Sequence, residues 1–409
     1  MTAATESDYT IANSDVVAKY RVAGDIATKV LSEIKKLCLP GAKIYEICVH
    51  GDELIDDEIS KIYNSKKNKV DSKSIAFPVT ISPNHIAAHL TPISSEDPSN
   101  LTLKKNDLIK IQLGAQVDGF ASIVADSYVV GLDKNEKITG RNADVISAAY
   151  YATEAALRTI KEDKKNFDVT SIVSKTSKFF NCTPLEGMLS HNQQRNVLNG
   201  PKEIIINPSE SQRSSVVPAK FEVGDVIGLD ILVSTSTDGK VKPTDIRTTI
   251  YKLTGTSYSL KLRASHQVLG EMKKKASNFP FAIRNLSDPI KGKMGLIECT
   301  NHNVMTAYDI MTEKEGEIIA QFYTTVALTK NGLVKLASSN FDISTVQSEN
   351  KITDDELLKL LSTPLKTNKK KKSKAKKASS AAEKPAATSV PATKAPPAPA
   401  PAPATKTAK

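Results

Sequence analysis

The chain has 409 residues and a formal net charge of +11, and this length is ample for a large hydrophobic core. Because no run of about 18 apolar residues occurs, the sequence predicts no membrane-spanning helix. The first 15 residues are polar and acidic and lack the basic start and apolar middle of a secretory signal. Residence in the cytosol or the nucleus is therefore expected.

The N-terminal part of the chain has apolar residues at the spacing of an α-helix. Apolar residues recur every three to four positions from residue 13 to residue 37, and Pro40-Gly41 ends this predicted helix. A second amphipathic stretch covers residues 44–62. A polar loop, KKNKVDSK, follows it.

Runs of β-branched residues follow, and they predict strands. Two of them are separated only by Val117-Asp118-Gly119, and Asp-Gly is a strong hairpin signal. Two helices are expected further along, at residues 142–160 and 169–180. The expected strands are residues 75–82, 108–117, 120–131, 202–208, 225–235 and 318–329.

Basic residues are unevenly distributed. Residues 366–409 hold twelve lysines and one glutamate, so the rest of the chain balances 44 basic against 44 acidic residues. This lysine- and Pro/Ala-rich stretch predicts a disordered tail after a folded domain of residues 1–365. The lysine block within this stretch is equally typical of a nuclear-import signal and of nonspecific polyanion binding. The lysines of the block are Lys369, Lys370, Lys371, Lys372, Lys374, Lys376 and Lys377.

A second basic segment lies inside the folded domain. Residues 252–293 contain nine basic and two acidic residues. We interpret residues 252–308 as a mixed helical insert between two strands of the main sheet. The cysteines include no CxxC pair, so four reduced and mostly buried thiols are expected instead of a zinc site. They are Cys38, Cys48, Cys182 and Cys299.

Five segments resemble type II methionine aminopeptidases in order and spacing. They are FPVTISPNHIAAHLTP (77–92), LIKIQLGAQVDGF (108–120), TPLEGMLSH (183–191), VGDVIGLDILVS (223–234) and EGEIIAQFYTTVAL (315–328). The resemblance covers about residues 10–345. It implies the α+β pita-bread fold, with two pseudo-symmetric halves around a central pocket.

Active members of that family hold two divalent metals with two aspartates, one histidine and two glutamates. Here the aspartate positions fall on Gln112 and Ile123, and the glutamate positions on Asp230 and Tyr323. His191 keeps the histidine position. Two hard cations need several carboxylates to bind them and to position a water. With three of the five ligand types lost, we expect no metal, no other cofactor and no catalytic residue.

The retained polar residues then have a different expected role. His89 matches a substrate-side histidine of the active enzymes. Without metals, His89, His191 and Asp230 are expected to be structural, hydrogen-bonded residues of the pocket wall. No GxSxG nucleophile elbow replaces the lost chemistry. A residual metalloaminopeptidase is a remote alternative.

Further motifs narrow the resemblance to the proliferation-associated, ErbB-receptor-binding proteins, which are inactive relatives of the aminopeptidases. These motifs are GRNADVISAAY (140–150), FNCTPLEGMLSH (180–191), RTTIYK (247–252), MTEKEGE (311–317) and the lysine-rich tail. The resemblance implies binding to the large ribosomal subunit near the exit tunnel, through its rRNA and exit-tunnel proteins. It also implies a role in subunit biogenesis or translation, and residence in the nucleolus and cytoplasm. A nuclear DNA-binding, transcription-linked protein is the alternative.

The basic insert is where we expect the RNA contact. Double-stranded RNA is read mainly through its shape and backbone, for which lysine and arginine suffice. A solvated helix face whose lysines contact nothing is the competing interpretation. The candidate RNA-binding residues are Lys261, Arg263, Lys273, Lys274, Lys275, Arg284, Lys291 and Lys293.

Overall fold

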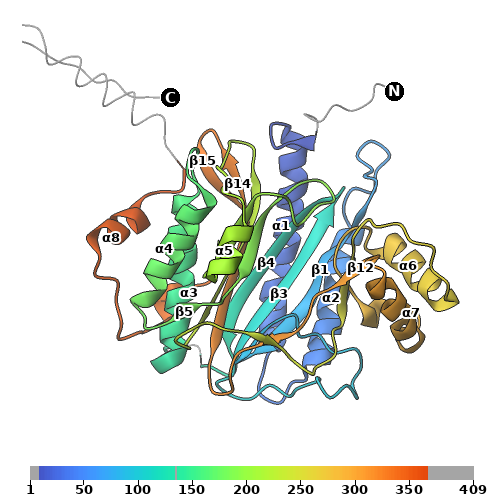
Figure 1. Cartoon of the computed structure of the whole chain (residues 1–409), viewed down its shortest axis with the longest axis horizontal. Helices are drawn as coiled ribbons and strands as arrows, with labels where there is room; N and C mark the ends of the chain where they lie inside the picture. Colours follow the sequence, from blue (N-terminus) through green and yellow to red (C-terminus); the bar gives the residue numbers. More distant parts are fainter. Residues whose placement is uncertain (1–8, 134–135, 367–409) are drawn as a thin grey trace, which may run out of the picture. The chain divides into compact units, whose positions relative to one another are not determined.

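A twisted antiparallel sheet forms the centre of the fold (Figure 1). The structure is a computed structural model that describes residues 9–133 and 136–366. The tail lysines, Lys369 to Lys377, therefore lie outside the described residues. Within the described ranges the main sheet has nine strands in the order β1-β3-β4-β14-β8-β6-β7, with β15 paired to β14 and β5 to β8.

The strands of this sheet come from both halves of the chain. Those of the first half are β1 (Lys73–Pro83), β3 (Leu108–Val117) and β4 (Phe120–Val129). Those of the second half are β5 (Thr183–Pro184), β6 (Met188–Gln193), β7 (Glu203–Ile206), β8 (Val226–Ser234), β14 (Ile319–Thr329) and β15 (Gly332–Ala337). A small separate sheet joins β2 (Ile86–Ala88), β13 (Met311–Thr312) and β9 (Lys242–Pro243).

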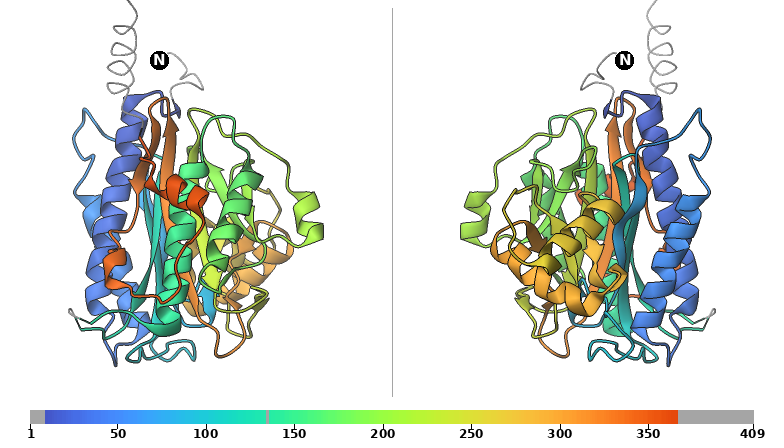
Figure 2. Two further views of the ribbon diagram at one scale, coloured as in Figure 1. Left: turned by 90° about the vertical axis from the view of Figure 1, so that its left-hand side faces the viewer. Right: turned by 90° about the vertical axis from the view of Figure 1, so that its right-hand side faces the viewer.

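Two helix pairs pack on the sheet, one pair for each half. The pairs are α1 (Ser14–Leu37) with α2 (Ile44–Ser60), and α3 (Gly140–Thr159) with α4 (Asn166–Lys178). The first pair packs on β1, β3 and β4, and the second on β14, β8 and β7. Figure 2 shows α1 and α2 side by side against the sheet. This pseudo-symmetric arrangement is the pita-bread fold expected from the sequence.

Local signals explain where these elements begin and turn. Helix α1 starts after Asn13, whose side-chain oxygen accepts a hydrogen bond from the Asp15 N–H at 2.9 Å. The β3–β4 hairpin turns at Asp118 and Gly119, both with positive φ (56° and 82°), as a type I′ turn requires. Helix α3 begins at Gly140, two residues before the predicted start, with Thr139 in the cap position.

The predicted insert is an α/β unit. It contains a three-stranded sheet in the order β11-β10-β12, which the sequence did not predict. Its elements are β10 (Ile250–Leu253), α6 (Arg263–Lys275), β11 (Phe281–Ala282), α7 (Pro289–Asn301) and β12 (Met305–Ala307). Helices α6 and α7 lie on the opposite side of the view from α3 and α4 (Figure 1). They approach closely, since a β-carbon on Gly295 would lie 2.6 Å from the Ala264 carbonyl carbon.

Two short helices complete the described chain, α5 (Glu210–Ser215) and α8 (Asp355–Ser362). All four cysteines are free and buried, as expected. In the described ranges, no helix combines the length and the apolar character that a membrane crossing needs.

Candidate functional site

Side chains alternate along the strands, and this alternation places five positions on one face of the main sheet. They are the ligand positions, which match the metal ligands of active methionine aminopeptidases. Gln112 of β3 lies opposite Ala125 of β4. Tyr323 of β14 lies opposite Ala125 on one side and Asp230 of β8 on the other. Directly opposed residues on neighbouring strands point to the same face. Gln112, Tyr323 and Asp230 therefore share a face.

The remaining two positions join that face through the same register. Ile123 lies two residues before Ala125 on β4, and residues two apart on a strand share a face. His191 of β6 lies opposite Gly228, which is two residues before Asp230. All five positions that the resemblance singled out are thus brought together.

The opposite face of the sheet carries the core. Ile109, Ile111 and Leu113 of β3 belong to a cluster that includes α1 and α2 residues. Ala320 and Phe322 of β14 belong to the cluster that includes α3 residues. The helix-packing residues and the pocket residues therefore alternate along the same strands.

An amide side chain links two of these five positions. Gln321 Nε2 donates to Gln112 Oε1 at 3.0 Å and to Asp230 Oδ1 at 2.8 Å. Gln321 was not predicted from the sequence, although it lies two residues before Tyr323 on the same face. Burial raises the pKa of Asp230 to about 7, against the opposing effect of the Gln321 hydrogen bond.

Tyr323 fills space beside the old histidine ligand. Its hydroxyl accepts a hydrogen bond from Gln193 Nε2 at 3.2 Å. A β-carbon on Gly228 would overlap that hydroxyl. Burial raises the pKa of Tyr323 well above its ordinary value, so the phenol is neutral. The other amide atom, Gln193 Oε1, is buried without a hydrogen-bond partner among the described residues.

The two retained histidines are held by main-chain carbonyls. His191 Nδ1 lies 3.3 Å from the Gly200 oxygen, and His89 Nδ1 lies 3.0 Å from the Asp309 oxygen. Burial lowers the pKa of both imidazoles, so both are neutral near pH 7. The His89 ring also meets Tyr308 edge-on, with ring centroids 5.3 Å apart.

These residues do not fit a pair of divalent metals. The donor set contains one histidine and one carboxylate, and an N–H group of Gln321 already occupies an oxygen of that carboxylate. Ile123 instead joins an apolar cluster with Phe77 and Phe279, against which Tyr323 packs. Across the described ranges, no three His, Cys, Asp or Glu side chains converge to hold an ion. This face of the sheet carries amides, aromatic rings and neutral imidazoles.

Most of the candidate RNA-binding residues lie on exposed parts of the α6–α7 hairpin. Six of the eight are exposed and Lys293 is half-buried. Lys275 donates to the Asn285 oxygen at 2.7 Å, and Lys291 pairs with Asp288 at 3.0 Å. The others have no side-chain partner among the described residues: Lys261, Arg263, Lys273, Lys274 and Lys293.

Arg284 is a correction to the sequence-based set. Its side chain is 2% exposed and forms an ion pair with Asp52 of α2. The guanidinium also bonds to the Thr91 hydroxyl and, at 3.3 Å, to the Val79 oxygen. Arg284 therefore cannot reach a phosphate. It fixes the insert to the rest of the domain.

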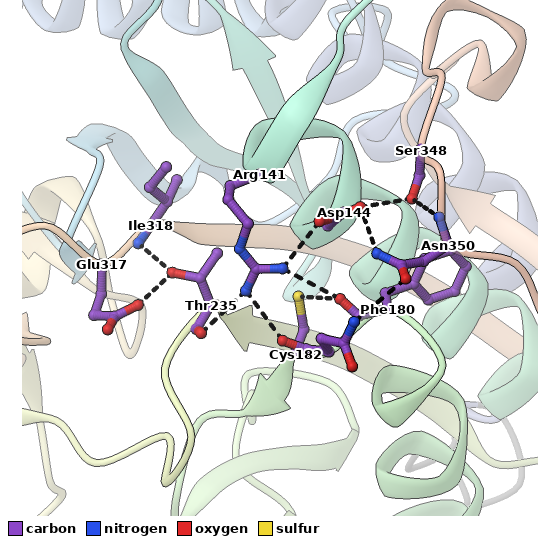
Figure 3. A network of polar contacts seen from close by, with 10 residues as sticks. Arg141, Asp144, Phe180, Cys182, Thr235, Glu317, Ile318, Ser348 and Asn350 are labelled. Carbon is purple, nitrogen blue, oxygen red and sulfur yellow. Dashed lines mark hydrogen bonds and ion pairs between the residues drawn. The ribbon is translucent and has the colours of Figure 1, made fainter.

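Three of the family motifs meet at another polar network (Figure 3). Arg141, at the start of α3, pairs with Asp144 at 2.9 Å and donates to the Asn181 and Thr235 oxygens at 3.0 and 3.1 Å. The hydroxyl of Thr235 bonds to the Glu317 carboxylate at 2.5 Å. These residues come from GRNADVISAAY, FNCTPLEGMLSH and MTEKEGE, and Thr235 directly follows β8. The motifs thus mark a structural junction.

Comparison with known proteins agrees with this geometry. The model of metallopeptidase family M24 matches residues 18–191. The "Curved DNA-binding protein" of Schizosaccharomyces pombe is 48% identical and matches 91% of this chain and 96% of its own. The "Proliferation-associated protein A" of Dictyostelium discoideum is 36% identical over 88% of this chain and 91% of its own. A solved thermophilic Arx1 has a TM-score of 0.81 and 34% identity, and covers 87% of this chain and 99% of its own.

The fold and the altered ligand set define an aminopeptidase-like protein of the M24 class. Within that class, the chain belongs to the proliferation-associated, ErbB-receptor-binding protein family.

Proposed function

We propose that this protein is a noncatalytic factor that binds the large ribosomal subunit near the exit tunnel and acts in subunit biogenesis or translation. The observation that carries the proposal is the exposed α6–α7 hairpin, whose unpaired cations project from a domain without the acids of a dinuclear site. We propose the large ribosomal subunit as the partner because of the resemblance to the proliferation-associated protein family.

The noncatalytic part of the proposal rests on the side chains at the five ligand positions. Gln112, Ile123 and Tyr323 supply no carboxylate, and Gln321 bonds to the one carboxylate that remains, Asp230. Metal analysis of the purified protein, with a Met-Ala-Ser cleavage assay in cobalt or manganese, tests it. We expect no stoichiometric metal and no turnover. Two bound ions with turnover would overturn this part.

The RNA contact is assigned to the free cations of the insert. Lys273 and Lys274 are exposed at the end of α6 and, among the described residues, have no acidic partner. Side chains that neutralise phosphates release counterions. Each such contact steepens the slope of log K against log salt concentration by about 0.9 for duplex DNA and about 0.7 for single strands. Binding through these lysines should therefore weaken steeply as salt rises.

Co-sedimentation with purified large ribosomal subunits tests the assignment. We expect Lys273→Glu with Lys274→Glu to weaken binding and to reduce its salt slope. The matched control is Lys66→Glu with Lys67→Glu, which makes the same charge change on an exposed loop before β1. Equal binding by both double variants would show that the RNA contact is placed wrongly.

The remaining parts of the proposal concern the tail and the cell. We propose that the tail lysines add nonspecific RNA affinity and direct the protein to the nucleolus as well as the cytoplasm. Imaging of the full chain beside a chain ending at residue 366 tests this. Unchanged nucleolar signal and unchanged RNA affinity would refute it.

DNA binding is the second candidate function, because a relative 48% identical to this chain is named a curved DNA-binding protein. The same exposed lysines suit either duplex, since both present a phosphate backbone. A competition experiment between curved DNA and large-subunit rRNA at physiological salt shows which of the two nucleic acids the protein binds more tightly. We expect the rRNA to compete more strongly.

A further inference from the structure

Helices α4 and α5 line a cavity that neither the altered ligand positions nor the α6–α7 hairpin shares. Its volume is about 580 Å³, within the range of about 300–1,000 Å³ that small-molecule sites occupy. Asn207 and Pro208, between β7 and α5, complete its lining. Helix α4 lies on the opposite side of the view from α6 and α7 (Figure 1).

Hydrogen bonds hold the walls of this cavity in place. The Thr170 hydroxyl of α4 donates to the Ile205 oxygen of β7 at 2.6 Å. Asn207 Nδ2 donates to the Pro184 oxygen at 2.8 Å and to the Asp238 oxygen at 3.3 Å. A capping box fixes the start of α5. The cavity is therefore formed before any ligand enters it.

Three cations and no acidic residue line the cavity. Lys175 and Lys178 belong to α4, and Arg213 belongs to α5. The folded domain has as many acidic as basic residues, so this is a local excess of positive charge. Lys178 and Arg213 have no acidic partner in the described part of the chain. Lys175 pairs with Asp354 at 2.7 Å, and its ammonium group keeps two further N–H groups.

The arginine distinguishes this cavity from an ordinary helix end. Lysines in the last turn of a helix also offset the helix dipole, so Lys175 and Lys178 alone would not indicate a ligand. Arg213 comes from another element, and its guanidinium carbon lies 4.7 Å from the centroid of the Phe167 ring. A stacked guanidinium keeps one orientation and can bind a phosphate with two parallel hydrogen bonds. Cations from two elements therefore line one cavity.

The uncharged lining indicates what else the ligand contains. Ser171 and Ser174 lie on the same face of α4 as the two lysines, at spacings of three and four residues. The Ser174 hydroxyl has no hydrogen-bond partner among residues 9–133 and 136–366. Phe179 and Pro208 are half-buried and add apolar surface. An inorganic anion would leave that surface uncovered, whereas a flat base can stack on an aromatic ring.

We propose that this cavity binds a nucleoside diphosphate. The phosphates bind Arg213 and the two lysines, the sugar hydroxyls bind the serines of α4, and the base covers Phe179 and Pro208. The site goes beyond the proposed ribosomal function and does not depend on it.

Calorimetric titration of the full-length protein at physiological salt, without divalent cations, tests the proposal. The probes are ADP, inorganic pyrophosphate and adenosine. The site variant carries Lys178→Gln and Arg213→Gln, which remove two charges and leave the ion pair of Lys175 in place. The matched control carries Lys161→Gln and Lys164→Gln, the same charge change at exposed positions before α4.

We expect ADP to bind more tightly than either pyrophosphate or adenosine, because only ADP meets both the cations and the apolar wall. The site variant should bind ADP about tenfold more weakly at an unchanged melting temperature, since it lacks two charged donors to phosphate. The control should bind ADP as the wild type does.

Three results would overturn the proposal. Absence of ADP binding to the wild type would remove the site. Equal affinity for ADP and pyrophosphate would show that the apolar wall recognises no base. Equal losses in the site variant and the control would show nonspecific attraction to surface charge. None of these results bears on co-sedimentation with large subunits, so the proposed function is tested separately.

Discussion

The hydroxyl of Tyr323 lies against Gly228, in the space where a β-carbon would stand. A tyrosine at this glutamate position therefore depends on a residue without a side chain on the neighbouring strand. Gln193 completes the arrangement by donating to the same hydroxyl at 3.2 Å. These three side chains form a packed structure, and their contributions to stability should be energetically coupled.

Gly228→Ala should destabilise the protein by about 2 kcal/mol, because the added methyl group overpacks a full site. Removing the hydroxyl with Tyr323→Phe should recover part of that loss. Urea unfolding of the two single variants and the double variant gives the coupling free energy. Strict additivity of the two effects would contradict the contact.

Asp230→Asn should change how stability depends on pH. Folding raises the pKa of this carboxyl from 3.8 to about 7, so the folded state holds the proton more tightly. The resulting stability is fully present below pH 3.8 and is lost as the pH rises through about 7. Asparagine keeps an acceptor for Gln321 and has no charge to bury.

The expected result is that the stability of Asp230→Asn relative to the wild type increases from pH 5 to about pH 7 and then levels off. The difference should change by at most about 1.4 kcal/mol per pH unit. Urea unfolding of both proteins from pH 5 to pH 8 measures it. A pH-independent difference would mean that Asp230 does not titrate in this window.

Arg284→Ala should destabilise the protein by about 3–5 kcal/mol, because it leaves the buried Asp52 carboxylate without its partner. Hydrogen exchange should rise in the insert, which loses its ion pair with α2. Arg263→Ala is the matched control, since that side chain is exposed, and it should shift stability by about 0.5 kcal/mol or less. Similar effects of the two substitutions would be incompatible with an anchoring role for Arg284.

Arg141→Lys should cost about 1–3 kcal/mol, because an ammonium group cannot reproduce the planar set of donors that bonds to Asp144, Asn181 and Thr235. Arg21→Lys on the exposed side of α1 serves as the control. Thermal unfolding compares the two. If both variants melt together, the network in Figure 3 does not join the elements as its hydrogen bonds indicate.

Elements with strong local signals were predictable from the sequence. Helix α1 has a capping asparagine and a regular apolar face, and the β3–β4 hairpin has Asp118 and Gly119. Strand β6 was missed because its buried side chains are polar. Ser190, Asn192 and Gln193 are buried there, so no apolar alternation marks it.

The candidate site was predictable in part for a similar reason. The five ligand positions follow from the resemblance, and the strand register brings them together. Gln321 was missed because an amide has no signature until its two partners are in place. Arg284 was misassigned because its ion pair with Asp52 joins residues far apart in the sequence, and composition alone counts every arginine as a free cation.

The alternation along the central strands has a final consequence. Residues that pack against the helices alternate with residues at the ligand positions, and the two sets point to opposite sides of the sheet. Gln112, Asp230 and Tyr323 point away from the face on which α1 and α3 pack. Substitutions at these positions can therefore change the chemistry of one face of the sheet while the helices on the other face keep their packing.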